Sequence, residues 1–270
     1  MNEVKLYDTT LRDGMQGQGM SLSAAEKVRV VRALDRLGID TIEAGFPSSN
    51  PKEVELFELL AEEPLERATI AAFGMTRRRG VEAGADEGLS ALVGCFAPVV
   101  TLVGKTWGLH LEKVTKVSRA ENLAMIGESV AFCDTNGSSL PDEIATATAT
   151  VGAELDGASI GIHTNNDAEC AVANSIAAVR AGATLVQGTV NGYGERTGNA
   201  NLISILPALQ LKLGYDCVEP ERLRWLTETA HLVDEICNVV PDPDQPYVGR
   251  NAFAHKGGLH AAAVGADAST

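Results

Sequence analysis

The chain has 270 residues, 45% of them hydrophobic and 21% charged, so it is long enough to bury the core of one large domain. Its net charge of −14 argues against nucleic-acid binding or an anionic-membrane surface, because both need an excess of basic side chains. Five cysteines without a CxxC pair, a start without a secretory signal and the absence of a long apolar run predict a cytoplasmic protein with reduced thiols and no membrane segment.

Strand and helix patterns alternate along the sequence. The clearest helix begins at Ser23, where Glu26 completes a capping box, and its apolar stripe ends at Gly38. Asn50 and Pro51 mark the start of the next helix. We predict strands near residues 4–7, 41–44, 69–73, 99–103, 131–133, 159–163 and 185–190, and further helices near 120–130, 142–151, 168–180 and 202–213. Strands separated by such helices predict right-handed βαβ units and a parallel sheet.

The repetition favours an α/β fold of the TIM type, a (β/α)8 barrel, but only seven strand positions can be found. The fifth is the weak one, because residues 130–132 would have to serve as helix end, loop and strand together. A loop alone takes about 2–6 residues and a strand about 5–6. We therefore expect one βα unit to be missing between Val130 and Cys133, the alternative being a very short strand there. The barrel is expected to span residues 1–214. A small helical subdomain is expected to span residues 215–270, with helices near 220–239 and 251–263.

Three polar clusters follow predicted strands, at residues 8–14, 163–167 and 194–201. In a parallel barrel the functional site lies at the carboxyl ends of the strands. Closing the sheet brings the first and last strands side by side, so the three clusters are expected to meet. This convergence predicts one site.

His163 and Asn165 alternate along one strand and can point to the same side. With Asp13 and Asn199 they offer one imidazole, one carboxylate and two amide oxygens, which suits Mg²⁺ or Mn²⁺ better than a structural zinc. Taken singly, each residue has an ordinary explanation as a turn residue, a helix cap or a hydrogen-bonded histidine. Their combination favours a metal site.

Three longer runs resemble the signatures of the isopropylmalate, homocitrate and citramalate synthase family: DTTLRDGMQ at residues 8–16, GIHTNND at 161–167 and NGYGERTGNA at 191–200. The runs PVVTLVGKTW (98–107), QPYVG (245–249) and AFAHKGGLH (252–260) look closest to the citramalate synthase branch. EAGFP at residues 43–47 resembles the isopropylmalate synthase branch more.

The resemblance implies that Asp13, His163 and Asn199 bind a divalent metal. In this family the second signature normally reads His-x-His, whereas here Asn165 stands in the place of the second histidine. An amide oxygen can still act as a ligand, but it is a weaker donor than imidazole. Metal affinity should therefore be lower than in a His-x-His relative.

The resemblance also implies roles in catalysis and substrate binding. Arg12 is expected at the reacting carbonyl, with Glu43 and Thr135 as further substrate contacts, and Glu195 or His260 as participants in proton transfer. The subdomain that contains His260 would reach the active site of a partner subunit, which implies a homodimer. Family members carry an acidic residue on the strand that is missing here.

The reaction implied is the condensation of acetyl-CoA with a 2-oxo acid, followed by thioester hydrolysis. Pyruvate, giving (R)-citramalate on a route to isoleucine, is the preferred 2-oxo acid. 2-Oxoisovalerate, giving isopropylmalate for leucine, is the alternative. An inactive, shortened member of the family is a further hypothesis, and a lyase of the hydroxymethylglutaryl-CoA kind is less favoured.

Overall fold

The computed structural model describes residues 3–47, 49–81, 85–105, 108–126, 132–134, 139–155 and 158–254, with the side chains of 123–126 and 132–134 excepted. Within these ranges the strands are β1 (Lys5–Asp8), β2 (Thr41–Gly45), β3 (Thr69–Met75), β4 (Val99–Val103), β5 (Phe132–Asp134), β6 (Gly161–Thr164) and β7 (Leu185–Gly188). The helices are α1 (Ala24–Leu37), α2 (Pro51–Ala61), α3 (Glu87–Gly94), α4 (Gly108–His110), α5 (Arg119–Ile126), α6 (Pro141–Glu154), α7 (Ala171–Arg180), α8 (Leu202–Pro207) and α9 (Leu226–Ile236).

The described strands form one parallel sheet in the order β4-β3-β2-β1-β7-β6-β5. This is the cyclic order of a β/α barrel, with the first strand paired to the last. The ring is interrupted at one place, because no pairing joins β4 to β5 among the residues that the structure describes. Seven strands in barrel order, broken between the fourth and fifth, are what the sequence predicted.

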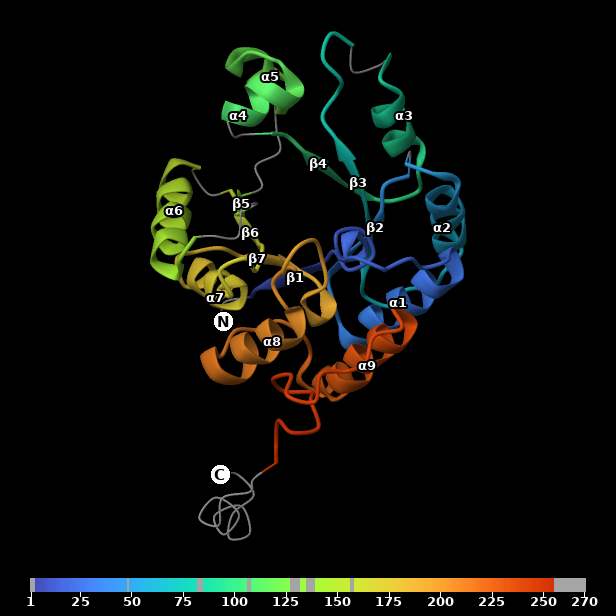
Figure 1. The fold of residues 1–270 in the computed structure, drawn as a ribbon, viewed down its shortest axis with the longest axis vertical. Helices are drawn as coiled ribbons and strands as arrows, with labels where there is room; N and C mark the ends of the chain where they lie inside the picture. The colour runs from blue at the N-terminus through green and yellow to red at the C-terminus, as the bar shows by residue number, and fades with distance from the viewer. Residues whose placement is uncertain are drawn as a thin grey trace.

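Helices cover the outside of the curved sheet. In Figure 1, α6 and α7 lie on one side of the strands, α1 and α2 lie on the other, and α8 and α9 lie below them. The alternation of one short strand with one helix positions every strand so that its carboxyl end faces the same rim. The polar clusters of the sequence follow these carboxyl ends.

The helix boundaries follow from local capping. Ser23 accepts a hydrogen bond from the backbone N–H of Glu26, whose carboxylate in turn accepts from the Ser23 N–H at 2.7 Å, as the capping box predicted. Gly38 ends α1 with φ 98°, a left-handed conformation that glycine adopts without steric cost. Asn50 caps α2 through the N–H of Glu53 and is followed by Pro51, also as predicted.

Several elements differ from the prediction, and α4 is among those not predicted. Helix α3 was not predicted; Asp86 caps it by accepting hydrogen bonds from the N–H groups of Gly88 and Leu89. The helix predicted at 202–213 ends as α8 at Pro207 and continues as a π-helical turn, Ala208–Lys212, because a proline nitrogen cannot donate to the preceding turn. The helix predicted at 220–239 starts as a 3-10 helix, Pro220–Trp225, before α9.

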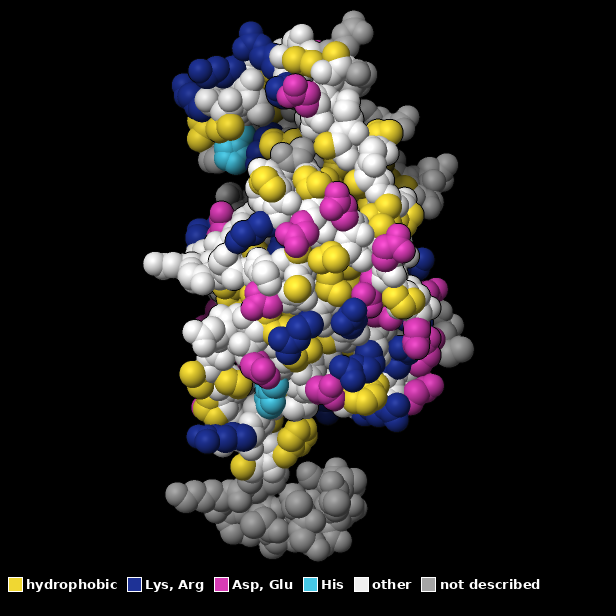
Figure 2. All heavy atoms as spheres, turned by 90° about the vertical axis from the view of Figure 1, so that its right-hand side faces the viewer, with side chains coloured by type: hydrophobic (Ala, Val, Ile, Leu, Met, Phe, Trp, Pro, Cys, Tyr) yellow, Lys and Arg dark blue, Asp and Glu magenta, His cyan; other side chains and the backbone are white. Residues whose placement is uncertain are grey.

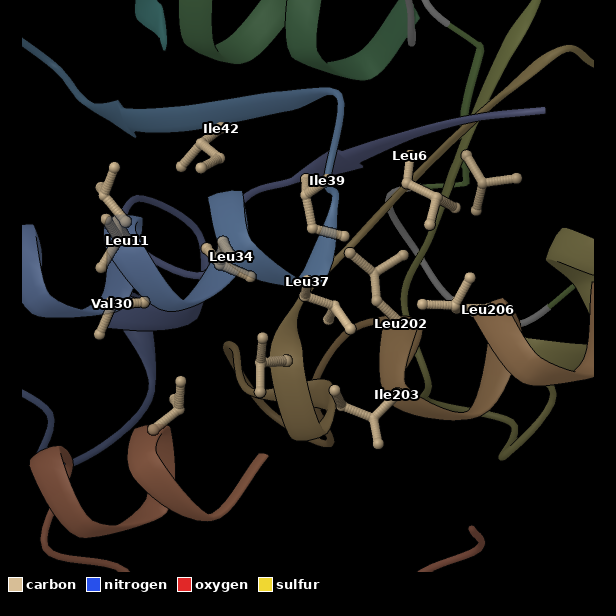
Figure 3. Packing of buried hydrophobic residues seen from close by; sticks show 14 of the residues in the cluster. Leu6, Leu11, Val30, Leu34, Leu37, Ile39, Ile42, Leu202, Ile203 and Leu206 are labelled. Atoms are coloured by element: carbon tan, nitrogen blue, oxygen red, sulfur yellow. The ribbon is translucent and has the colours of Figure 1, made fainter. Parts of the chain in front are cut away.

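One hydrophobic cluster fills the space between sheet and helices. Figure 3 shows Leu6 of β1 and Ile42 of β2 beside Leu34 and Leu37 of α1, with Leu202 and other α8 side chains close by. Side chains of α9 also belong to this cluster, including Ala230 and Val233. Residues 215–254 therefore pack on the barrel through α9. Residues 251–254, where the helix predicted at 251–263 would begin, form a turn, and the remainder of that prediction lies outside the described residues. The proposed boundary at residue 214 stays a prediction.

Acidic and basic side chains intermingle on the face that Figure 2 shows. Ion pairs also join neighbouring helices, for example Arg36 of α1 with Glu228 of α9. In the part of the chain that is described, no helix has the length and apolar character of a membrane-spanning segment.

Candidate metal and active site

The polar segments after β1, β6 and β7 are held together by backbone hydrogen bonds. The N–H of Thr9 donates to the carbonyl of Gly188 at 2.9 Å. The N–H of Ala200 donates to the carbonyl of Thr164 at 3.0 Å, and the N–H of Asn166 to that of Gly198 at 2.9 Å. The predicted convergence of the three clusters at one rim of the sheet is therefore present.

Asp13 and His163 meet across this rim. Nε2 of His163 lies 3.3 Å from Oδ2 of Asp13, and both side chains are largely buried. Burial would raise the pKa of the Asp13 carboxyl, but the hydrogen bond from His163 and the charge of Arg12 outweigh it and hold the pKa below its usual value. Asp13 is therefore a carboxylate at neutral pH. The other ring nitrogen of His163, Nδ1, is buried and has no hydrogen-bond partner among the residues that the structure describes.

Asn165 and Asn199 form a second pair at the same rim. Nδ2 of Asn165 donates to Oδ1 of Asn199 at 3.1 Å, and the two residues also form an isolated antiparallel bridge between the segments after β6 and β7. Asn165 lies two residues beyond His163, just past the end of β6. The four predicted ligands are thus arranged as two pairs, one joining the loop after β1 to β6 and the other joining the segments after β6 and β7.

This donor set fits a hard divalent cation. It offers an ionised carboxylate, an imidazole with an unpartnered buried nitrogen and two amide groups, a mixture suited to Mg²⁺ or Mn²⁺. Among the described residues, no three His, Cys, Asp or Glu side chains gather as a metal-binding group. A cation at this rim would therefore depend on the two amides as well as on Asp13 and His163, and their roles as ligands stay a prediction.

Arg12 is held beside this set by β2 and β3. Its Nε lies 2.5 Å from Oε1 of the fully buried Glu43, and its guanidinium lies 4.1 Å from the ring centroid of Phe73. Its Nη1 lies 3.4 Å from Oδ1 of Asp13, one of the predicted metal ligands. Arg12 thus spans the space between β2 and the predicted ligands, which suits a group that meets a carbonyl oxygen.

Both oxygens of Glu43 are engaged by the protein. Oε1 pairs with Arg12, and Oε2 accepts a hydrogen bond from the hydroxyl of Tyr7 at 2.8 Å. Tyr7 also contacts the hydroxyl of Thr101 on β4. The predicted substrate contact of Glu43 stays a prediction; the contacts seen hold Arg12 in place. Tyr7 was not anticipated from the sequence, because nothing in a short apolar strand signals a partner more than 30 residues away.

Asp8 organises the first loop. Its carboxylate accepts hydrogen bonds from the backbone N–H and the hydroxyl of Thr10, and the same hydroxyl accepts from the N–H of Val190. Asp8 is fully buried, and this burial raises the pKa of its carboxyl to about 7 against the effect of the Thr10 hydrogen bonds. The residue belongs to the first predicted cluster but was given no role from the sequence.

The remaining predicted site residues are Glu195, Thr135 and His260. Glu195 is exposed, with 55% of its side chain accessible, and lies 3.5 Å from Arg196. Arg196 forms a two-point ion pair with Asp167 at 2.7 and 2.8 Å. His260 and Thr135 lie outside the described residues, so their predicted roles are not tested. A cavity of about 230 Å³ opens beside Arg12 and Phe73.

Comparison with known proteins identifies the family and the fold. The sequence model of the HMGL-like family matches residues 3–133 and 127–233. The chain belongs to this HMGL-like family. Its relatives include the (R)-citramalate synthase of Synechocystis sp., which is 46% identical over 96% of this chain and 56% of the relative. The (R)-citramalate synthase of Aquifex aeolicus is 42% identical over 99% of this chain and 59% of the relative. A probable 2-isopropylmalate synthase of Methanopyrus kandleri is 36% identical over 97% of this chain and 58% of the relative. The chain thus spans less than two thirds of the length of these relatives.

Solved structures confirm the barrel fold. An HMG-CoA lyase from Bacillus subtilis superposes with a TM-score of 0.72 at 17% identity, covering 90% of this chain and 96% of the lyase. An HMG-CoA lyase from Acinetobacter baumannii, in complex with coenzyme A and 3-methylmalate, superposes with a TM-score of 0.75 at 15% identity. This match covers 94% of this chain and 97% of the lyase. At these identities the likeness concerns the fold.

The alignments also locate the missing unit. The Synechocystis match has 309 aligned positions, but 96% of this chain is only about 259 residues, so about 50 positions have no counterpart here. The HMGL-like match breaks into two segments that meet at residues 127–133, between α5 and β5. That stretch contains the predicted gap between Val130 and Cys133. About 50 residues are enough for one βα unit, in agreement with the interruption between β4 and β5.

Proposed function

We propose that this chain is the catalytic region of a citramalate synthase, an acyltransferase that condenses acetyl-CoA with pyruvate to give (R)-citramalate and free CoA with the help of a divalent metal. The observation that carries the proposal is the meeting of Arg12, the Asp13–His163 pair and the Asn165–Asn199 pair at the carboxyl ends of β1, β6 and β7. Five (R)-citramalate synthases at 40–46% identity over nearly the whole chain support the same reaction.

In this mechanism a base removes a proton from the methyl group of acetyl-CoA, and the resulting enolate carbon attacks the keto carbon of pyruvate. The keto oxygen becomes an alkoxide, which a guanidinium can stabilise and which then takes up a proton. Arg12 is suited to this task because Glu43 and Phe73 fix its direction while its Nη1 faces Asp13. Water then hydrolyses the thioester, releasing the carboxylate and CoA.

Asp13, His163 and Asn199, with Asn165 beside them, would hold the divalent metal. When bound, such an ion acts as a Lewis acid and orients the 2-oxo acid. The ionised carboxylate of Asp13 supplies the negative charge that the cation needs, and Nε2 of His163 is the ring nitrogen that faces this carboxylate. Mg²⁺ and Mn²⁺ both suit the donor set.

Glu195 and His260 remain our candidates for proton transfer, and Thr135 for substrate binding. The accessible carboxylate of Glu195 supports a part in proton transfer, although Arg196 competes for it. We also infer a homodimer in the cytoplasm, with His260 serving the partner's site. The resemblance of residues 252–260 to the citramalate synthases supports this arrangement.

Two observations favour an inactive relative as the second candidate. The barrel lacks closure between β4 and β5 within the described residues, and Asn165 replaces an imidazole that the family signature carries. Isopropylmalate synthase is the less favoured substrate alternative, since those relatives match at 32–36% identity.

A thiol-release assay tests the proposal. Purified full chain is mixed with acetyl-CoA and either pyruvate or 2-oxoisovalerate, with and without Mn²⁺, and the released CoA is titrated. We expect metal-dependent release with a preference for pyruvate, and its loss in Asp13→Ala. Preference for 2-oxoisovalerate would assign the chain to the isopropylmalate branch. Absence of release in a folded chain that still binds Mn²⁺ would identify the inactive relative.

A further inference from the structure

We propose that Asp234 of α9 is a positioning residue that orients the amide of Asn199 toward the metal. This inference rests on the proposed function, because Asn199 is a ligand only if the metal site is used. Asp234 is buried, with 3% of its surface accessible, and lies outside the barrel segment predicted from the sequence. It touches none of the four predicted ligands in any contact that the structure describes.

Asp234 binds the turn that follows β7. Its Oδ1 accepts hydrogen bonds from Nδ2 of Asn191, at 2.5 Å, and from the hydroxyl of Tyr193. The amide of Asn191 also donates to the carbonyl of Ala230 at 2.9 Å and accepts from Nε2 of Gln245 at 2.9 Å. Asn191 adopts φ 57°, a left-handed conformation that its neighbours must hold. Helix α9 and the loop after it thereby fix the shape of this turn.

The same turn, which contains residues 191–194, also holds Asn199. The backbone N–H of Asn199 donates to the carbonyl of Gly192 at 2.9 Å, and its Nδ2 donates to the carbonyl of Tyr193 at 2.9 Å. A Cβ on Gly194 would lie 2.2 Å from Nδ2 of Asn199, so the amide is packed directly on the turn. With Nδ2 engaged there, the oxygen Oδ1 is left to face Asn165 and the metal rim.

A structural explanation alone accounts poorly for Asp234. In the described part of the chain no lysine or arginine forms an ion pair with it, and its hydrogen-bond donors are the neutral groups of Asn191 and Tyr193. Burial raises the pKa of its carboxyl, although these hydrogen bonds and the nearby His231 act in the opposite direction. Burying a carboxylate against neutral donors costs free energy that an apolar residue would not. A role in orienting a metal ligand would explain why a carboxylate occupies this buried position, since residues that hydrogen-bond around metal ligands set the geometry of those ligands.

Mn²⁺ binding to the full chain, followed by the electron paramagnetic resonance signal of free Mn²⁺, tests the role without measuring activity. Asp234→Asn keeps the size of the side chain but removes its charge and half of its acceptor capacity, and Tyr193→Phe removes one donor while leaving the carbonyl that holds Asn199. We expect both variants to weaken Mn²⁺ binding about 10–100-fold, as is typical for residues behind a ligand. Glu235→Gln, at the exposed neighbouring position of α9, is the matched control and should leave binding unchanged.

The outcomes separate the two proposals. If the parent binds Mn²⁺ and Asn199→Ala loses it, while Asp234→Asn and Tyr193→Phe bind within twofold of the parent, the positioning role is overturned and the metal site stands. If the parent chain binds no Mn²⁺, both proposals fail. A lowered melting temperature with unchanged affinity below that temperature would assign Asp234 a purely structural role and also overturn the inference.

Discussion

Glu43→Gln should destabilise the fold strongly, because it removes the partner of a buried charge. Glu43 is fully buried, and its Oε1 lies 2.5 Å from Nε of Arg12, whose side chain is 16% exposed. Removing one partner of a buried ion pair typically costs about 3–5 kcal/mol, since the other charge stays buried. Asp13, 3.4 Å from Nη1 of Arg12, compensates part of that charge. We therefore expect the lower end, a loss of about 3 kcal/mol in the free energy of unfolding.

Urea unfolding followed by circular dichroism measures this loss. The matched control is Glu63→Gln. Glu63 likewise pairs with an arginine, accepting hydrogen bonds from Arg32 at 2.7 and 2.8 Å, but the side chain of Arg32 is 61% exposed. Water screens that pair, so the control should change the unfolding midpoint far less. The double variant Arg12→Met/Glu43→Gln should recover part of the lost stability, since it removes the unpaired charge as well. Equal shifts in the two single variants would refute the reasoning.

Three further changes have defined outcomes. The raised pKa of Asp8, about 7, means that the folded chain keeps a proton which the unfolded chain releases near pH 4, so the free energy of unfolding falls as pH rises between these values, by at most about 4 kcal/mol. Asp8→Asn should flatten that fall in urea titrations at pH 5 and 7.5, and an unchanged slope would exclude Asp8 as its source. Asn165→His should tighten Mn²⁺ binding in the resonance titration, and no gain would show that this side chain faces away from the ion. Gly194→Ala should weaken Mn²⁺ binding by displacing the Asn199 amide, whereas Gly94→Ala, where a Cβ meets nothing within 4 Å, should not.

Local signals in the sequence were sufficient for the elements that begin and end with specific side chains. The capping box at Ser23 and the left-handed Gly38 fixed α1 at both ends, because each satisfies backbone groups that the helix leaves free. The same applies to Asn50 and Pro51 at α2. Helix α3 escaped prediction although Asp86 caps it, because its short apolar segment shows no clear helical period.

The site was predictable as a neighbourhood but not as a set of contacts. Strand order brought Asp13, His163 and Asn199 to one rim, since the carboxyl ends of adjacent parallel strands lie together. The supports of that rim were not predictable in this way. The Arg12–Glu43 pair joins residues 31 apart, and Asp234 acts from a helix beyond the barrel, so both depend on packing that no local pattern encodes.

The position of the break in the barrel affects metal binding and condensation differently. The strands that carry the predicted metal site, β1, β7 and β6, are consecutive in the sheet. β2 with its Glu43 lies on the other side of β1, and β5 lies between β6 and the break. The interruption lies at the two ends of the order, between β4 and β5. Val100 of β4 is exposed, with 42% of its surface accessible, as expected for an apolar strand residue that a neighbouring βα unit would cover. The loss of that unit thus leaves the scaffold of the metal ligands complete while removing one wall and the acidic residue that the family resemblance places on it. We therefore expect metal binding and condensation to be separable in this chain, so that Mn²⁺ binding would persist even if the thiol-release assay detected no condensation.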